Sequence, residues 1–383
     1  MMSTTRKVVI ALAPLLAVCC CALAQQSATQ PAAAQEQVTQ VNPWVAPGPG
    51  GRLAQLCEDE AAEGTLLSRT SSVSLRVYGS EHFVLFHAAQ DTWARRMGEL
   101  LEKAQTNFRA SIRQAGFETE PPGARLIWVC FRGMDDFDQY SRQSDQVDMT
   151  WTDGYYSART NRVALVLPSS VAPRQGDGVE LAGSGRVAQF GPQPDSRPAG
   201  DERLDPRWIT HELAHQLSFN CGLQKRGVTY PLWLSEGLAT NFESDNDGRF
   251  GFGRDNPPRR RTLLNAYTRG RLTSLRRFVM LDHLEAGGEA QARQDYAQCW
   301  GLYRFLSQER PAQLRQYLQG LKALEAGSRD GTELRREFIE AFGPMDRVDA
   351  DWQNWLDGLL ADTDKPREAR HLNVAAAPPV QLP

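Results

Sequence analysis

The chain has 383 residues, which is enough for one large domain or two smaller ones. Charged residues make up 23% of the sequence and the net charge is −3, a balance that argues against nucleic acid as the main partner. The one dense basic run, Arg259 to Arg261, is expected to be a solvated loop and not a binding patch.

The first 24 residues have the pattern of a secretory signal peptide. Arg6 and Lys7 precede an apolar stretch from Val8 to Val18, and Ala22-Leu23-Ala24 is typical of a cleavage site, so that the mature chain would begin at Gln25. The apolar stretch is too short to span a bilayer as a helix. We therefore expect a periplasmic or secreted protein without a stable membrane span.

The cysteines leave two questions open. Cys19, Cys20 or Cys21 could carry a lipid anchor, although the residues that precede them do not fit a lipoprotein signal. Removing the signal peptide leaves four cysteines, which are compatible with up to two disulfides or with free buried thiols. These four are Cys57, Cys130, Cys221 and Cys299.

Composition separates a folded domain from three irregular segments. Residues 25–70 are rich in Ala, Gln, Pro and Gly, which predicts a flexible arm with one short helix around Leu53–Ala62. Residues 169–203 are rich in Gly, Pro, Asp and Gln, and a loop of this length is usually either functional or disordered. The tail 362–383 is expected to be disordered. The folded domain is therefore predicted over 71–361.

Hydrophobic periodicity predicts the elements of this domain. The expected strands are Ser74–Tyr78, His82–His87, Arg125–Phe131, Gly154–Ser157 and Arg162–Leu167, the last two forming a hairpin. The expected helices are Thr92–Gln114, with Asp91 as its N-cap, then Asp135–Arg142, 206–222 and 231–244, and most of the remainder to 361. This pattern indicates an α+β fold with a mixed sheet and a helical second half.

The helix 206–222 carries the clearest chemical motif. Asp205 is predicted as its N-cap and Pro206 as its first residue. His211 and His215 are four residues apart, so both imidazoles project from one helix face and can bind the same ion. A separate apolar stripe comprises Ile209, Leu213 and Leu217.

A third ligand for the same ion is predicted on the next helix. A catalytic zinc usually has three protein ligands and one open position for water. Glu236 follows a helix start at Pro231, and the short connection between the helices would place them side by side. Gly237 would let these two helices approach closely. Glu212, one residue after the first histidine, would be the general base that takes the proton of the water.

These motifs resemble the gluzincins of the peptidase MA clan, and in particular secreted bacterial proteins assigned as peptidases that carry a domain of unknown function. The resemblance spans roughly 74–306 and depends mainly on His211-Glu212-Leu213-Ala214-His215 and Trp233-Leu234-Ser235-Glu236-Gly237-Leu238-Ala239. It implies a zincin-like fold, one Zn²⁺ in a cleft between a sheet subdomain and a helical subdomain, and hydrolysis of a peptide or protein substrate. It also implies that Arg162–Leu167 lines the substrate cleft. The 169–203 segment departs from the family.

Two further site residues are expected. Glu243 is seven residues after Glu236 and could accept the free ring N–H of His211, or it could be a solvated helix carboxylate. Similarity to the gluzincins implies that Tyr296 donates a hydrogen bond to the developing oxyanion, with Tyr303 as the alternative donor. The other histidines, His82, His87, His283 and His371, have no ligand spacing. The alternative function is a catalytically silent protein of this fold that binds peptide or cell-wall material.

Overall fold

A computed structural model describes residues 58–70, 74–149, 152–167, 204–243, 254–285 and 288–363. The expected signal peptide, most of the expected arm with Cys57, the 169–203 segment, His371 and nearly all of the tail lie outside these ranges.

Five strands of the described chain form one mixed sheet. Its order is β1 (Arg76–Gly79), β2 (Phe83–His87), β3 (Leu126–Phe131), β5 (Arg162–Val166) and β4 (Gly154–Ser157). The inner pairs β2–β3 and β3–β5 are parallel, whereas β1 and β4 run antiparallel at the two edges. The prediction of a mixed sheet in an α+β fold is therefore confirmed.

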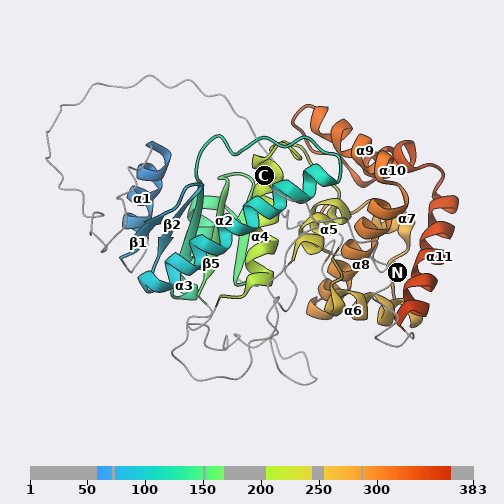
Figure 1. Ribbon diagram of the computed structural model, residues 1–383, viewed down its shortest axis with the longest axis horizontal. Coiled ribbons are helices and arrows are strands. Elements are labelled where there is room, and N and C mark those ends of the chain that lie inside the picture. The colour runs from blue at the N-terminus through green and yellow to red at the C-terminus, as the bar shows by residue number, and fades with distance from the viewer. Residues whose placement is uncertain are drawn as a thin grey trace, which may run out of the picture.

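Helices cover both faces of this sheet (Figure 1). Side chains alternate along a strand, so β3 sends Trp128 into one core and Val129 into the other. On the Trp128 face the sheet packs against α2 (Asp91–Gln114) and α4 (Pro206–Asn220). On the Val129 face it packs against α1 (Glu58–Thr70) and α3 (Met134–Tyr140), which continues as a short π-helix, Ser141–Asp145.

The second half of the domain is helical, and Figure 1 shows it beside the sheet half. Its elements are α5 (Leu232–Phe242), α6 (Pro257–Thr268), α7 (Leu275–Phe278), α8 (Gly288–Glu309), α9 (Pro311–Ala323), α10 (Gly331–Phe342) and α11 (Met345–Thr363). The cores of the two halves are continuous, because α4 packs against α5. No helix within the described ranges is long and apolar enough to cross a membrane.

Gly237 serves a different contact from the one predicted. A Cβ added there would lie 2.6 Å from the Cβ of Tyr303 and 2.8 Å from the carbonyl oxygen of Cys299, both on α8. Real Cβ atoms do not approach other atoms this closely, so only glycine fits at this position. The close approach is therefore between α5 and α8, and the expectation that Gly237 serves the contact between the two motif helices is wrong.

Two local predictions near the N-terminus also need correction. The N-cap position of α2 is Gln90, whose side chain makes no capping bond, while Asp91 lies in the first turn and pairs with Arg76 at 2.9 Å. A carboxylate in the first turn is favourable because it faces the positive end of the helix dipole.

The helix expected at 53–62 extends instead over Glu58–Thr70, and 53–57 lie outside the described residues. Buried ion pairs join it to the sheet, with Glu60 bound to Arg125 and Glu63 bound to Arg162. This part of the expected arm is therefore packed against the domain.

The structure shows whether three of the four cysteines form disulfides. Cys130, Cys221 and Cys299 are buried and free. Burial raises the pKa of each thiol, which keeps all three protonated and unreactive at neutral pH.

Candidate metal centre

The motif helix α4 begins where the sequence predicts. The Asp205 side chain accepts hydrogen bonds from the backbone N–H groups of Arg207 and Trp208, at 3.1 and 3.4 Å, and Pro206 follows the cap. Such a cap typically contributes about 1 kcal/mol to stability. The predicted apolar stripe is buried, which turns one face of the helix toward the core. Its members are Ile209, Leu213 and Leu217.

A buried polar contact fixes the rotation of α4 against the sheet. Gln216, the residue after His215, accepts a hydrogen bond from the indole N–H of Trp128 at 2.8 Å. Its amide nitrogen donates to the carbonyl oxygens of Ile127 and Asn161, at 3.3 and 3.2 Å. Turning the helix would leave these buried groups unpaired, at a typical cost of about 1–3 kcal/mol each. The directions of the histidines are therefore set by the residue beside them.

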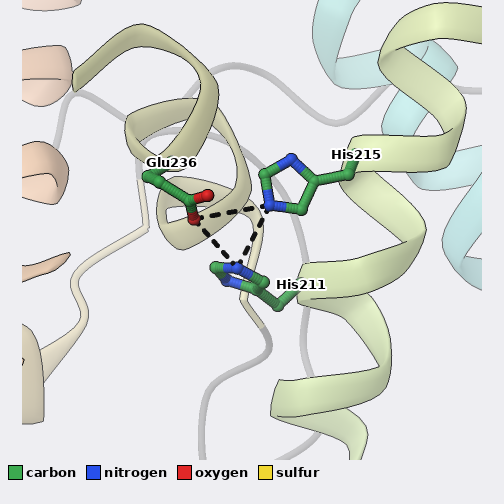
Figure 2. Close-up of side chains that lie close together, drawn as sticks. All are labelled: His211, His215 and Glu236. Atoms are coloured by element: carbon green, nitrogen blue, oxygen red, sulfur yellow. Dashed lines mark hydrogen bonds and ion pairs between the residues drawn. The ribbon is translucent and has the colours of Figure 1, made fainter. Parts of the chain in front are cut away.

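Three potential ligand atoms converge between α4 and α5, as predicted. His211 and His215 extend from one helix and Glu236 from the other, and Figure 2 shows their polar ends facing one another. Oε2 of Glu236 lies 3.2 Å from Nε2 of His211 and 3.4 Å from Nε2 of His215, and the two ring nitrogens are 3.3 Å apart. Two imidazoles and one carboxylate in this arrangement could hold a metal ion.

The electrostatics of this cluster favour a positive charge at its centre. Oε2 of Glu236 is buried and has no well-oriented hydrogen bond among the described residues, although two ring nitrogens are near. Burial lowers the pKa of His211, but the carboxylates of Glu236 and Glu243 raise it more, to about 10. Burial acts to raise the pKa of Glu236, but the charge of His215 and the contacts with both histidines outweigh burial and lower the pKa to well below its usual range. A bound cation would supply the same positive charge.

Glu212 lies beside the cluster without belonging to it. Its side chain is buried, and its carboxylate accepts a hydrogen bond from the backbone N–H of Tyr156 on β4. Burial raises the pKa of Glu212, while the charges of His211 and His215 oppose that rise. A carboxylate with a raised pKa next to a metal site is a suitable proton acceptor.

The edge of the sheet beside α4 is formed by β4. β5 is paired on both sides, with β3 and with β4, so Arg162–Leu167 offers no free strand edge. The edge strand is β4, which packs directly on α4: a Cβ added at Gly154 would lie 2.1 Å from the Trp208 ring. That Arg162–Leu167 lines a substrate cleft stays a prediction, and β4 forms the sheet edge that packs on the helix carrying His211 and His215.

Of the two alternatives for Glu243, the structure shows the contact with His211 and not a solvated carboxylate. Its Oε1 atom is 3.1 Å from the Nδ1 atom of His211, on the ring side away from the cluster. Asn256 donates to Oε2 at 2.7 Å, and Arg259 donates to Oε1 at 2.6 Å. Burial acts to raise the pKa of Glu243, but the guanidinium of Arg259 lowers it more, to about 2.

Arg259 is the site residue that the sequence analysis missed. It was expected in a solvated loop, but it lies in the first turn of α6, with its side chain only 23% exposed. Asn256 caps that helix, accepting from the backbone N–H of Arg259 at 3.3 Å. The only signal in the sequence was this Asn-Pro-Pro helix start, which places the three arginines on a helix instead of a loop.

Tyr296 lies next to the cluster and Tyr303 does not. The Tyr296 ring meets the His211 ring edge to face, with centroids 5.9 Å apart. Its hydroxyl makes no hydrogen bond among the described residues, and burial raises its pKa well above the usual value, so it stays neutral and able to donate. Tyr303 is buried in the core against Gly237.

The remaining described histidines take other contacts. His82 faces Glu102, His87 faces the carbonyl oxygen of Ala89, and His283 faces Asp282. Within the described part of the chain, His211, His215 and Glu236 form the one group with metal-ligand spacing.

Part of the chain is similar to a recognised sequence family. Residues 207–324 match DUF1570, whose description is a protein of unknown function. The match begins in α4 and ends just after α9, so it contains His211, His215 and Glu236 together with Arg259 and Tyr296. No curated protein matches the chain.

Proposed function

We propose that the protein is a zinc metallopeptidase of the gluzincin type, with His211, His215 and Glu236 as the zinc ligands. The supporting observation is the spacing of the three donor atoms, at 3.2, 3.3 and 3.4 Å. Ligands about 2.05 Å from a tetrahedral zinc lie about 3.3 Å from one another, because the edge of a tetrahedron is roughly 1.63 times its centre-to-vertex distance.

The donor types favour zinc over the common hard cations. Magnesium and calcium are bound mainly by oxygen ligands, six or more in number, whereas two imidazoles and one carboxylate suit zinc. Three protein ligands leave a fourth position for water, which is the pattern of a catalytic site and not of a structural one. Zinc in such a site lowers the pKa of bound water and polarises a carbonyl.

The residues around the ligands can perform the remaining steps of peptide hydrolysis. Glu212 would take the proton of the attacking water and pass it to the leaving amine. The Tyr156 N–H restrains that carboxylate from the side of β4. Tyr296 would donate a hydrogen bond from its hydroxyl to the carbonyl oxygen of the scissile bond as negative charge develops there. Glu243 orients His211 by accepting its Nδ1–H.

The fold is compatible with this reading. The helix that carries the two histidines, α4, packs beside β4 at the edge of the sheet. The proposed metal cleft would run between the sheet half and the helical half. The presence of Glu212 between intact histidines favours an enzyme over the alternative, a catalytically silent protein that binds peptide or cell-wall material.

We also propose that the protein is exported and acts in the periplasm or outside the cell. This proposal is based on the pattern of residues 1–24. Sequencing the N-terminus of the mature protein tests it: Gln25 as first residue supports soluble export, whereas a lipid-modified cysteine supports the anchored alternative.

A peptide library tests the function. The zinc-loaded mature protein is incubated with the library, and the products are sequenced, with the Glu212→Gln variant and chelator-treated protein as controls. Cleavage by the wild type alone supports a metallopeptidase. Zinc binding without cleavage of any peptide supports the silent alternative.

A further inference from the structure

Arg259 contacts both of the side chains that flank His211. Its guanidinium meets the Glu243 carboxylate at two points, with Nη2 2.6 Å from Oε1 and Nε 3.3 Å from Oε2. The same guanidinium lies over the Tyr296 ring, 5.2 Å from its centroid. Glu243 and Tyr296 both contact His211. Arg259, Glu243, His211 and Tyr296 therefore form a closed cycle of side-chain contacts.

This cycle of contacts joins elements that are distant in the sequence. His211 belongs to α4, Glu243 directly follows α5, Arg259 lies in the first turn of α6, and Tyr296 lies on α8. Asn256 strengthens the junction, because it caps α6 with its Oδ1 and donates its amide N–H to Glu243. The Glu243 carboxylate is therefore bound from three directions and has little freedom to turn.

The chemistry of the contacts suits arginine and not a simple positive charge. A guanidinium is planar and forked, so it can bind both carboxylate oxygens and present a flat face to an aromatic ring at once. A cation over a partly buried tyrosine ring typically contributes about 0.5–2 kcal/mol. If Arg259 only neutralised Glu243, a lysine would serve equally well, and the contact with Tyr296 would have no consequence.

We propose that Arg259 is a positioning residue that holds Glu243 against His211 and also holds Tyr296 beside the metal centre. One guanidinium thereby sets both the orientation of a metal ligand and the place of the hydrogen-bond donor. The link to Tyr296 rests on the proposed function, whereas the link through Glu243 requires only that the cluster binds a metal.

Metal affinity tests the link through Glu243 without any enzyme assay. Zinc affinity of the full mature chain is measured by competition with a chromogenic chelator for wild type, Arg259→Gln and Arg259→Lys. The control is Arg261→Gln, an exposed arginine on the same helix. We expect a loss of about 10- to 100-fold for Arg259→Gln, the usual effect of removing support from a ligating histidine. Unchanged affinity in folded Arg259→Gln would overturn the inference.

Turnover tests the link to Tyr296. With a peptide that the wild type cleaves, Arg259→Lys is expected to keep zinc affinity within a few fold but to lower kcat at least about tenfold, because its ammonium lacks the planar face. The loss should be much smaller when Tyr296→Phe is already present, since the affected hydroxyl is then absent. Wild-type kcat in Arg259→Lys, or equal losses in both backgrounds, contradicts the link.

A loss of stability in Arg259→Gln can be separated from a loss of zinc affinity. Arg259→Gln leaves the buried Glu243 carboxylate without its cation, so the double variant Arg259→Gln/Glu243→Gln is measured beside it, because it removes both charges. We expect the double variant to fold and to bind zinc more weakly than Arg261→Gln does. Equal zinc affinity in the double variant and in Arg261→Gln would overturn the inference. If the wild type cleaves no peptide, the proposed function fails, but these affinities still decide the metal-dependent half.

Discussion

The backbone N–H of Tyr156 donates a hydrogen bond to the carboxylate of Glu212. Tyr156 belongs to the edge strand β4, and Glu212 directly follows His211 on α4. The edge of the sheet therefore contacts the proposed general base through its main chain.

Glu212→Gln is expected to retain zinc and the fold but to lose hydrolysis by about 10²- to 10⁴-fold, the usual contribution of a general base. Glutamine matches the shape of glutamate and can still accept the Tyr156 bond, but it cannot take a proton from water. The measurements are zinc content, circular dichroism and kcat, with the exposed Glu118→Gln as the matched control. Near-normal turnover in Glu212→Gln would assign the base to another residue.

Tyr296→Phe is expected to lower kcat about 100-fold or more while zinc content stays unchanged, because one donor to the developing oxyanion is removed. The matched control is Tyr267→Phe, which removes a hydroxyl that donates to Asp357. A wild-type rate in Tyr296→Phe would show that Tyr296 only packs against His211.

Gly237→Ala is expected to destabilise the protein by about 1–3 kcal/mol, because the added methyl overlaps α8. It should also disturb zinc binding, since Glu236 is the adjacent residue. The control is Gly320→Ala on α9, where an added Cβ meets nothing within 4 Å. That change should be neutral or stabilising, because alanine is favoured over glycine within a helix. Thermal unfolding of both variants checks the prediction; equal melting temperatures would show that α5 and α8 can separate without cost.

The candidate site could be predicted largely because its signals are local. The spacing of His211 and His215 is a property of one helix, and Asp205 with Pro206 marks where that helix begins. Glu236 and Glu243 were found by spacing on the following helix, with Glu243 at its end. The strands were found because buried runs such as Leu126–Phe131 are continuously apolar.

The errors concern contacts between elements that are distant in the sequence. In the sequence, nothing distinguishes Arg259 from the two arginines that follow it. In the structure, α6 packs near the end of α5, and Arg259 pairs with Glu243 there. Gly237 indicates a close approach, but nothing in the sequence says that the partner is α8. The hairpin of β4 and β5 is confirmed, but its place in the sheet depends on the pairing of β5 with β3, which local periodicity does not encode.

The most direct test of the central claim is the zinc content of the mature protein, measured by mass spectrometry of the metal after purification in zinc-containing buffer and removal of free ions. The account predicts one zinc per chain in the wild type, and little or none in His215→Ala and Glu236→Ala, because two ligands cannot hold the ion tightly. Both variants must remain folded by circular dichroism. One zinc per chain in both variants, or none in the wild type, would contradict the assignment of His211, His215 and Glu236 as the metal centre.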